Sequence, residues 1–62
     1  MTFVRVRLAL DRLPPGGILE VLLKGEEPRR NVPRTAAEQG HQVLSQADLP
    51  GGVTRLVLRR KG

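Results

Sequence analysis

The run Pro-Pro-Gly-Gly at residues 14–17 constrains the fold of this chain most, because it separates two segments with different hydrophobic periods. Before the run, apolar residues recur at spacings of three and four, which predicts an amphipathic helix over residues 2–13. Its apolar stripe consists of Phe3, Val6, Leu10 and Leu13. Proline has no amide hydrogen, and the residue before it avoids helical torsion angles, so the helix must end here. Thr2 is the predicted N-cap.

After the run, residues 18–24 alternate between two faces and predict a strand. Leu19, Val21 and Leu23 fall on the face expected to be buried, and Gly25 ends the strand. A second helix is predicted over residues 28–39, closed by a glycine at position 40. Acidic residues at 26 and 27 precede it, and prolines at 28 and 33 are expected to shorten or distort its first turns.

The last third of the chain predicts a hairpin. Residues 41–46 and 53–60 read as strands, and the connection over 47–52 is rich in turn-forming residues. Along the final strand, Thr54, Leu56 and Leu58 are expected to face the core. The order helix, strand, helix, strand, strand predicts an α/β protein of the α+β two-layer sandwich type. We expect a single domain over residues 1–62, with two helices on one face of a mixed three-stranded sheet.

Composition excludes several kinds of site. The 62 residues contain no cysteine and one histidine, so they offer neither a disulfide nor a structural zinc site, and we expect no cofactor and no metal. No apolar run approaches the ~20 residues of a membrane span, and a secretory signal is not visible. We therefore expect a cytoplasmic protein. The formal net charge of +5 attracts polyanions but does not identify a ligand.

Several of these features together resemble the TusA/SirA family of small sulfur-carrier proteins, which are sulfurtransferases. They are the segment FVRVRLALDRLPPGGILEVLL at residues 3–23, the helix start GEEP at 25–28, and the pair Gly40-His41 between the second helix and the next strand. The resemblance covers nearly the whole chain. It implies a fold in which one further strand precedes the first helix, so this chain is expected to have that fold without its first strand.

The resemblance also implies a chemistry that these residues cannot perform. In the family, a Cys-Pro-x-Pro motif precedes the first helix, and its cysteine accepts sulfur from a cysteine desulfurase as a persulfide and passes it on, for example toward tRNA thiolation. This chain begins at about the third position of that motif and contains no cysteine. Thr2 cannot replace the cysteine, because an alcohol forms no stable persulfide.

The function implied by the resemblance is therefore a sulfur-relay accessory protein that is truncated or degenerate and cannot itself carry sulfur. Either the start of the reading frame is misplaced and the motif lies upstream, or the chain is a shortened paralogue that kept a scaffold role. Its partners would be a cysteine desulfurase or a sulfur-acceptor protein. The alternative is a non-catalytic binding module that docks a protein or an RNA backbone through an Arg-rich surface.

Five arginines are the candidate residues for binding an anion or a partner. Arg29, Arg30 and Arg34 lie near the start of the second helix, where a bound anion would offset the positive helix dipole. Arg55 and Arg59 are expected on the open face of the sheet. An RNA contact there would involve phosphates only, since the strands carry no aromatic side chain for base stacking. No residue is a catalytic candidate, because the chain shows no acid–base pair and no phosphate loop.

Loss of the first strand has a further consequence. If that strand normally lies beside residues 18–24, its absence exposes a hydrophobic sheet edge, and exposed edges pair with other chains. We therefore expect a homodimer formed through this edge.

Overall fold

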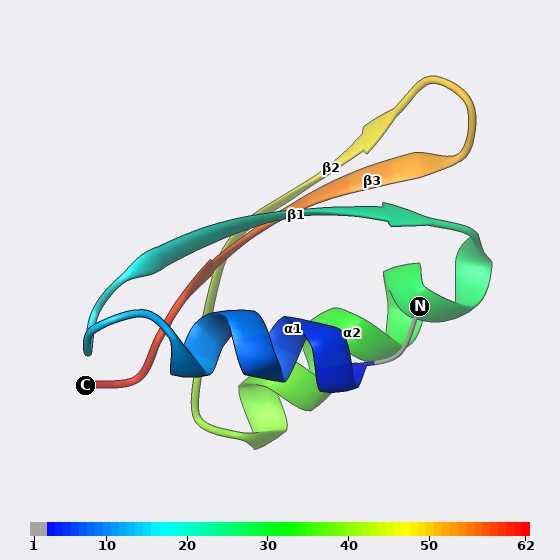
Figure 1. Cartoon of the computed structure of the whole chain (residues 1–62). Helices are drawn as coiled ribbons and strands as arrows, with labels where there is room; N and C mark the ends of the chain where they lie inside the picture. Colours follow the sequence, from blue (N-terminus) through cyan, green and yellow to red (C-terminus); the bar gives the residue numbers. More distant parts are fainter. Residues whose placement is uncertain (1–2) are drawn as a thin grey trace.

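The computed structural model describes residues 3–62, which form two helices and three strands (Figure 1). Their order along the chain is α1 (Phe3–Asp11), β1 (Ile18–Lys24), α2 (Glu26–Glu38), β2 (Gln42–Leu49) and β3 (Val53–Arg59). This is the predicted order of elements, and β1 has the predicted bounds. The predicted N-cap, Thr2, lies outside the described residues.

The three strands form a sheet in the order β1-β3-β2, with both neighbouring pairs antiparallel. The prediction of a mixed sheet was wrong in this detail, although the two-layer α+β class is confirmed. The reason is that β3 returns from the β2 hairpin and inserts between β1 and β2, which run parallel but do not touch. In the β1–β3 ladder, Ile18 pairs with Arg59 and Lys24 pairs with Val53. The β2–β3 ladder contains an irregularity between Val43 and Ser45.

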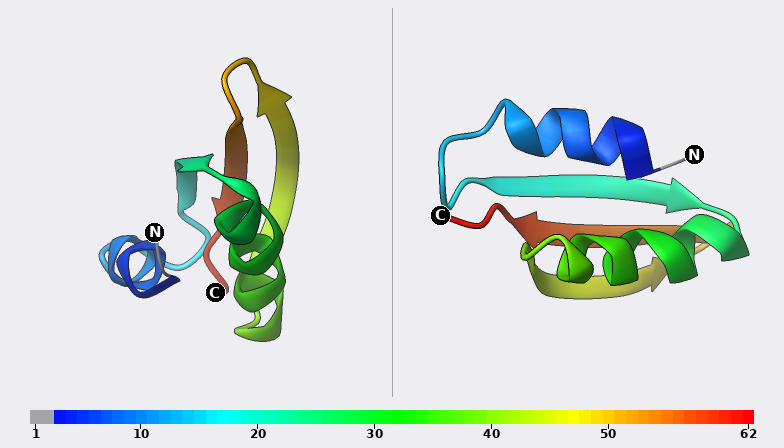
Figure 2. Two further views of the ribbon diagram at one scale, coloured as in Figure 1. Left: turned by 90° about the vertical axis from the view of Figure 1, so that its right-hand side faces the viewer. Right: turned by 90° about the horizontal axis from the view of Figure 1, so that it is seen from below.

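Both helices cover the same face of the sheet, as predicted, and the core lies between the two layers (Figure 2). Each element except β2 contributes buried apolar side chains, and these are Val6, Leu10, Val21, Leu23, Val32, Ala36, Leu56 and Leu58. They occupy the predicted positions on α1, β1 and β3. The side chains that alternate with them on β1 and β3 face the other side of the sheet, which no described element covers.

The two helices are placed differently on that face. α2 contacts all three strands, whereas α1, within residues 3–62, contacts only α2 and β1. Figure 2 shows α1 displaced beyond the β1 edge of the sheet, with α2 beneath β3 and β2. Consequently Val4 and Leu8, which lie off the buried stripe of α1, keep 62% and 57% of their surface exposed.

The ends of α1 and α2 differ from the prediction by one or two residues. α1 ends at Asp11, two residues earlier than predicted. One further turn follows it, in which the amide of Leu13 donates to the Leu10 carbonyl at 3.0 Å, and Pro14 ends this turn. α2 begins at Glu26, two residues earlier than predicted, because Pro28 lies in the first turn, where its missing amide hydrogen costs nothing.

Helix α2 also runs through Pro33 without a break. Proline at this position leaves the carbonyl oxygen of Arg29 without its helical donor. The side-chain amide of Gln46, on β2, donates a hydrogen bond to that oxygen at 3.4 Å. A residue from the sheet therefore compensates for the proline, which is consistent with α2 continuing through Pro33 without a break.

The predicted closing glycine of α2 is confirmed. Gly40 adopts a φ of 88°, and the amides of Gly40 and His41 bond the carbonyls of Ala37 and Ala36, both at 3.0 Å. This pattern is a Schellman motif, which satisfies the last carbonyls of the helix. Because the His41 amide is used in this way, β2 begins one residue later than predicted.

β2 extends to Leu49, three residues beyond its predicted end. Asp48 and Leu49 pair with Thr54 and Val53, so only Pro50, Gly51 and Gly52 form the turn. Both glycines have positive φ, near 81° and 73°, a conformation that other residues adopt with difficulty. Among residues 3–62, no helix is long and apolar enough to cross a bilayer.

Candidate functional site

The five candidate arginines lie on two separate surfaces and do not form one site. Arg29, Arg30 and Arg34 project from α2, and Arg55 and Arg59 project from the uncovered face of β3. Acidic neighbours engage most of them.

Arg29 forms the best-defined ion pair. Its Nε and Nη2 atoms donate to the two carboxylate oxygens of Asp48 on β2, each at 2.8 Å. Such a two-pronged pair fixes the angle between the two groups as well as their distance. The hydrogen bond from Arg29 lowers the pKa of Asp48 below its usual value, and Asp48 in turn raises the pKa of Arg29. Thr54, which is buried, donates a third hydrogen bond to the Asp48 carboxylate at 3.3 Å.

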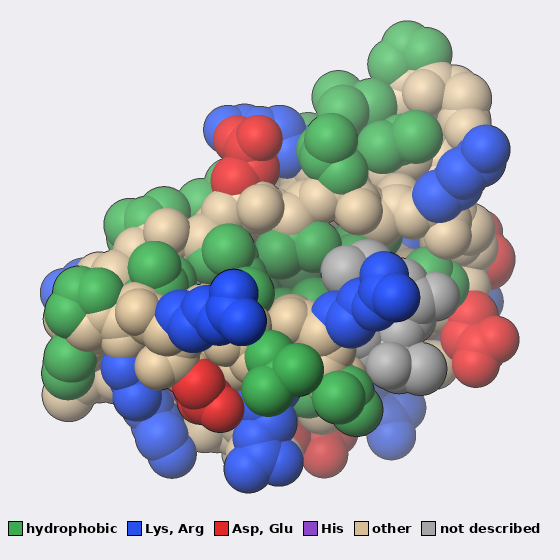
Figure 3. Space-filling model, in the orientation of Figure 1, with side chains coloured by type: hydrophobic (Ala, Val, Ile, Leu, Met, Phe, Trp, Pro, Cys, Tyr) green, Lys and Arg blue, Asp and Glu red, His purple; other side chains and the backbone are tan. Residues whose placement is uncertain are grey.

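Arg55 is paired as well. Its Nη2 atom lies 2.7 Å from Oε2 of Glu20 on β1, so the middle of the uncovered face is locally neutral. Hydrophobic side chains surround this pair. Ile18, Leu22 and Leu44 are exposed by 54%, 58% and 44% respectively. Figure 3 shows hydrophobic side chains at the surface of the molecule, with lysine and arginine between them.

The remaining arginines of α2 form only exposed pairs. Arg34 lies 3.2 Å from Glu38, one helical turn along α2, and Arg30 lies 3.9 Å from Glu26. Exposed pairs of this kind contribute about 0.3–0.5 kcal/mol at most. Their acidic partners nevertheless reduce the positive potential of α2 that the sequence suggested.

Arg59 differs from the other four. Within residues 3–62 it forms no ion pair with an acidic side chain, and its guanidinium lies over Gly16 in the turn between α1 and β1. Two further cations, Arg60 and Lys61, follow it directly. Sequence reasoning identified Arg59 but could not show that turns distant in the chain meet beside it.

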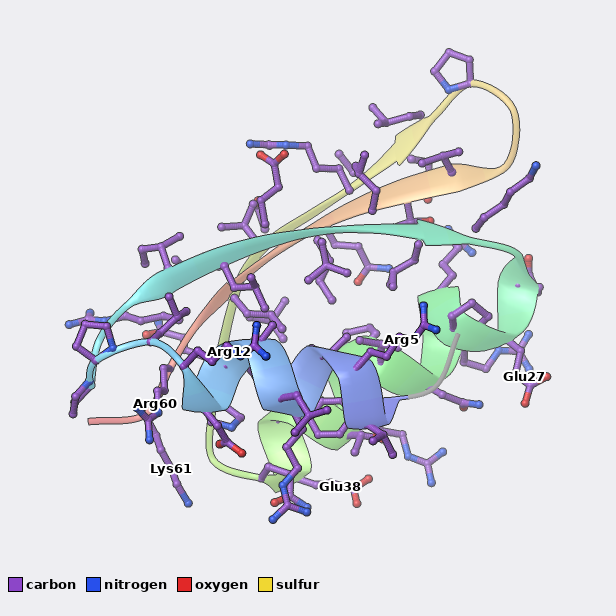
Figure 4. The ribbon with its side chains drawn as sticks, in the orientation of Figure 1. Arg5, Arg12, Glu27, Glu38, Arg60 and Lys61 are labelled. Carbon is purple, nitrogen blue, oxygen red and sulfur yellow. The ribbon has the colours of Figure 1, made fainter. Side chains whose placement is uncertain are left out.

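The start of α1 is the place where the resemblance puts the sulfur chemistry. There, a hollow of about 400 Å³ lies between Phe3 and the exposed side of α2. Glu27 and Glu38, labelled in Figure 4, line its two ends, and Arg34 lies between them. The hollow contains no thiol, and among residues 3–62 no three His, Cys, Asp or Glu side chains gather as metal ligands would. These residues offer no thiol nucleophile for sulfur.

Comparison with known proteins identifies the family. The sequence model of "Sulfurtransferase TusA" matches residues 1–60. A protein of Archaeoglobus fulgidus, named "Putative sulfur carrier protein", is 41% identical over 44 residues, which are 71% of this chain and 50% of that protein. The chain therefore spans about half the length of this relative. No solved structure gives a significant match. Since the family model covers nearly the whole chain and the fold agrees with it, this chain belongs to the TusA family of sulfurtransferases.

Proposed function

We propose that this chain is an accessory protein of a sulfur relay, and that the 62 residues supply its scaffold and docking surfaces but not its sulfur-bearing thiol. The match of the TusA family to residues 1–60, in a chain without cysteine, carries this proposal. A thiolate is required to accept sulfur, and the start of a helix favours the thiolate through its free amides and dipole. In this proposal a cysteine placed before α1 would benefit from the helix dipole, and the 62 residues themselves supply no cysteine.

In this proposal the chain binds a cysteine desulfurase or a sulfur-acceptor protein in the cytoplasm, and the relay leads toward thiolation of tRNA. The hollow beside Phe3 is the docking site for that partner. The hollow is lined by both apolar and charged side chains, a composition typical of protein–protein interfaces that form and dissociate.

The mass of the protein isolated from its own organism, before and after thiol alkylation, tests where the thiol comes from. A species heavier than 6.8 kDa that gains one alkyl group would place the cysteine on the same polypeptide. A species of 6.8 kDa that gains no alkyl group would mean that the chain acts only as a scaffold. In that case it should bind a desulfurase or a sulfur-acceptor protein saturably. A 6.8 kDa species that binds neither would overturn the proposal.

We also propose that the β1 edge pairs with the β1 edge of a second copy. The two edges of the sheet differ: β2 carries an irregularity that hinders pairing, whereas β1 is regular over seven residues. Val4 and Leu8 of α1 are exposed, and α1 itself lies beyond the β1 edge of the sheet (Figure 2), where a further strand would extend the sheet.

Sedimentation at about 100 µM should therefore show dimers, since edge pairing of this kind depends on concentration. Replacing Leu8 by lysine should shift the protein to monomers, whereas Leu44→Lys, on the β2 side, should leave the dimer unchanged. A compact monomer for the unmodified chain, or equal effects of both substitutions, would contradict the proposal.

A further inference from the structure

A second hollow, of about 540 Å³, lies at the opposite end of α1 from Phe3. Three segments that are far apart in the sequence meet there. They are the turn between α1 and β1 with Gly16, the turn between α2 and β2 with Gly40, and the segment that follows β3. Of the side chains that line the hollow, three are cationic, Arg59, Arg60 and Lys61, and none is Asp or Glu.

The backbone holds this basic segment in place. The amide of Gly16 donates to the Arg60 carbonyl at 3.0 Å, and the Arg60 amide donates to the Gly17 carbonyl at 2.8 Å. The next amide, that of Lys61, donates to Nδ1 of His41 at 3.1 Å. The segment is therefore fastened to both turns at once. The backbone of this segment is therefore positioned before any ligand arrives, which lowers the entropic cost of binding.

The three side chains enter the hollow from different directions. The Arg59 guanidinium lies over Gly16, and the Lys61 side chain runs beside Gly40, where a methyl group on the glycine would come within 3.2 Å of Lys61 Cδ. Arg60 extends to the end of α1, and its Nη1 atom donates to the Leu13 carbonyl. Figure 4 shows Arg60 and Lys61 projecting on the same side of the molecule, close to the end of α1.

These cations differ electrostatically from the arginines of α2 and from Arg55. The four arginines paired with Asp or Glu side chains are Arg29, Arg30, Arg34 and Arg55. In the part of the chain that the structure describes, no acidic side chain pairs with the three cations of the hollow. Like charges held close together repel each other, and a multiply charged anion relieves this repulsion.

We propose that this hollow is an anion-binding site that takes a phosphoryl group carrying at least two negative charges. Arginine supplies parallel N–H donors that suit phosphate oxygens, and lysine adds a compact positive charge. Because Gly16 and Gly40 carry no side chains, the Arg59 and Lys61 side chains can lie directly against these two turns at the walls of the hollow. A carboxylate, with one charge, would offset the repulsion less completely.

Titration of the full chain with pyrophosphate, followed by NMR, tests this site. We expect saturable shifts of the Gly16, Gly40 and Lys61 amides. Arg59→Gln and Lys61→Gln should each weaken binding about fivefold, the effect of losing one partly exposed charge contact. Arg5→Gln is the matched control, because it removes the same charge at the other end of α1 (Figure 4) and should leave affinity unchanged. Equal losses in all three variants, or shifts that do not saturate, would overturn the proposal.

Two further measurements sharpen the result. A chain synthesised with a C-terminal amide removes the carboxylate of Gly62, which lies beside the hollow, and should bind pyrophosphate at least as tightly. A short single-stranded RNA tests the source of the phosphoryl group. Competition between RNA and pyrophosphate would show that a nucleic-acid phosphate can fill the site, and pyrophosphate binding without competition would indicate a small phosphorylated ligand. RNA binding that persists while pyrophosphate fails to bind would contradict the assignment to this hollow.

Discussion

Helices α1 and α2 cover the same face of one sheet, yet they are attached to it in different ways. α2 contacts every strand and is joined to β2 by the Arg29–Asp48 pair and by the Gln46 bond. α1 reaches only β1 and α2, and its far side exposes Val4 and Leu8. α2 thus completes the fold of this chain, whereas α1 leaves apolar side chains exposed on its far side.

The largest expected effect comes from Leu10→Ala, which tests whether α1 is nevertheless essential to the core. Leu10 is fully buried, and truncating such a leucine costs about 2–5 kcal/mol. A domain of this size has little more stability than that, so circular dichroism should show a largely unfolded chain. Arg7→Ala, at an exposed position of α1, should change the free energy of unfolding by less than about 0.5 kcal/mol. A cooperative fold retained by L10A would mean that α1 is dispensable.

Ala36→Leu tests how closely α2 is packed on the sheet. Ala36 has no exposed surface, so a larger side chain must displace its neighbours at a cost of about 1–3 kcal/mol. Ala37→Leu adds the same atoms to the exposed side of the same helix and should be nearly neutral. Urea denaturation compares the two variants. Similar midpoints for both would contradict the close packing of α2.

Gly17→Ala strains the connection of α1 to the sheet. A methyl group on Gly17 would lie 2.9 Å from Leu13 Cβ and 3.0 Å from the Pro14 carbonyl oxygen. We expect a loss of about 1–2 kcal/mol, the cost of a modest steric overlap. Hydrogen exchange should become faster in α1 than in α2, because only α1 depends on this turn. Uniform acceleration across both helices would show that they open as one unit.

Asp48→Asn should have the smallest effect, and one that depends on pH. In the folded chain Arg29 lowers the pKa of Asp48 from its usual value of 3.8, so folding releases protons there. The stabilisation is complete above pH 3.8 and is lost as pH falls through the lower, folded pKa. The difference in thermal midpoint between the native chain and D48N should therefore be small at pH 7 and vanish in acid. Glu38→Gln, which breaks a pair within α2, is the control. A difference in thermal midpoint that grows toward low pH would contradict a stabilising Arg29–Asp48 pair.

Hydrophobic periodicity was sufficient to predict most of the fold. The alternation in β1, the stripe on α1 and the closing glycine of α2 are all local patterns, and the structure confirms each of them. The order of the strands was not accessible in this way, because it depends on which strand the hairpin inserts beside. The extent of β2 was underestimated because Asp48 resembles a turn residue until its partners, Thr54 and Arg29, are known.

The ion pairs of the candidate arginines could be predicted only where both partners lie on one helix. Spacing alone shows that Arg34 and Glu38 lie one helical turn apart. It cannot show that Glu20 lies beside Arg55, since these residues are distant in the chain and meet only across two strands. The basic hollow was missed for the same reason: two turns and the segment after β3 must come together before Arg59, Arg60 and Lys61 line one surface.

The strand order also governs when this fold can form during synthesis. β3 is the middle strand of the sheet, yet among the described elements it is the last to be synthesised. Until it is available, β1 and β2 lack their pairing partner within residues 3–62, because they do not pair with each other. In the nascent chain the apolar segments of β1 and β2 therefore stay unpaired until β3 has been synthesised. The three-stranded sheet then forms in one late step, which pairs Ile18 with Arg59.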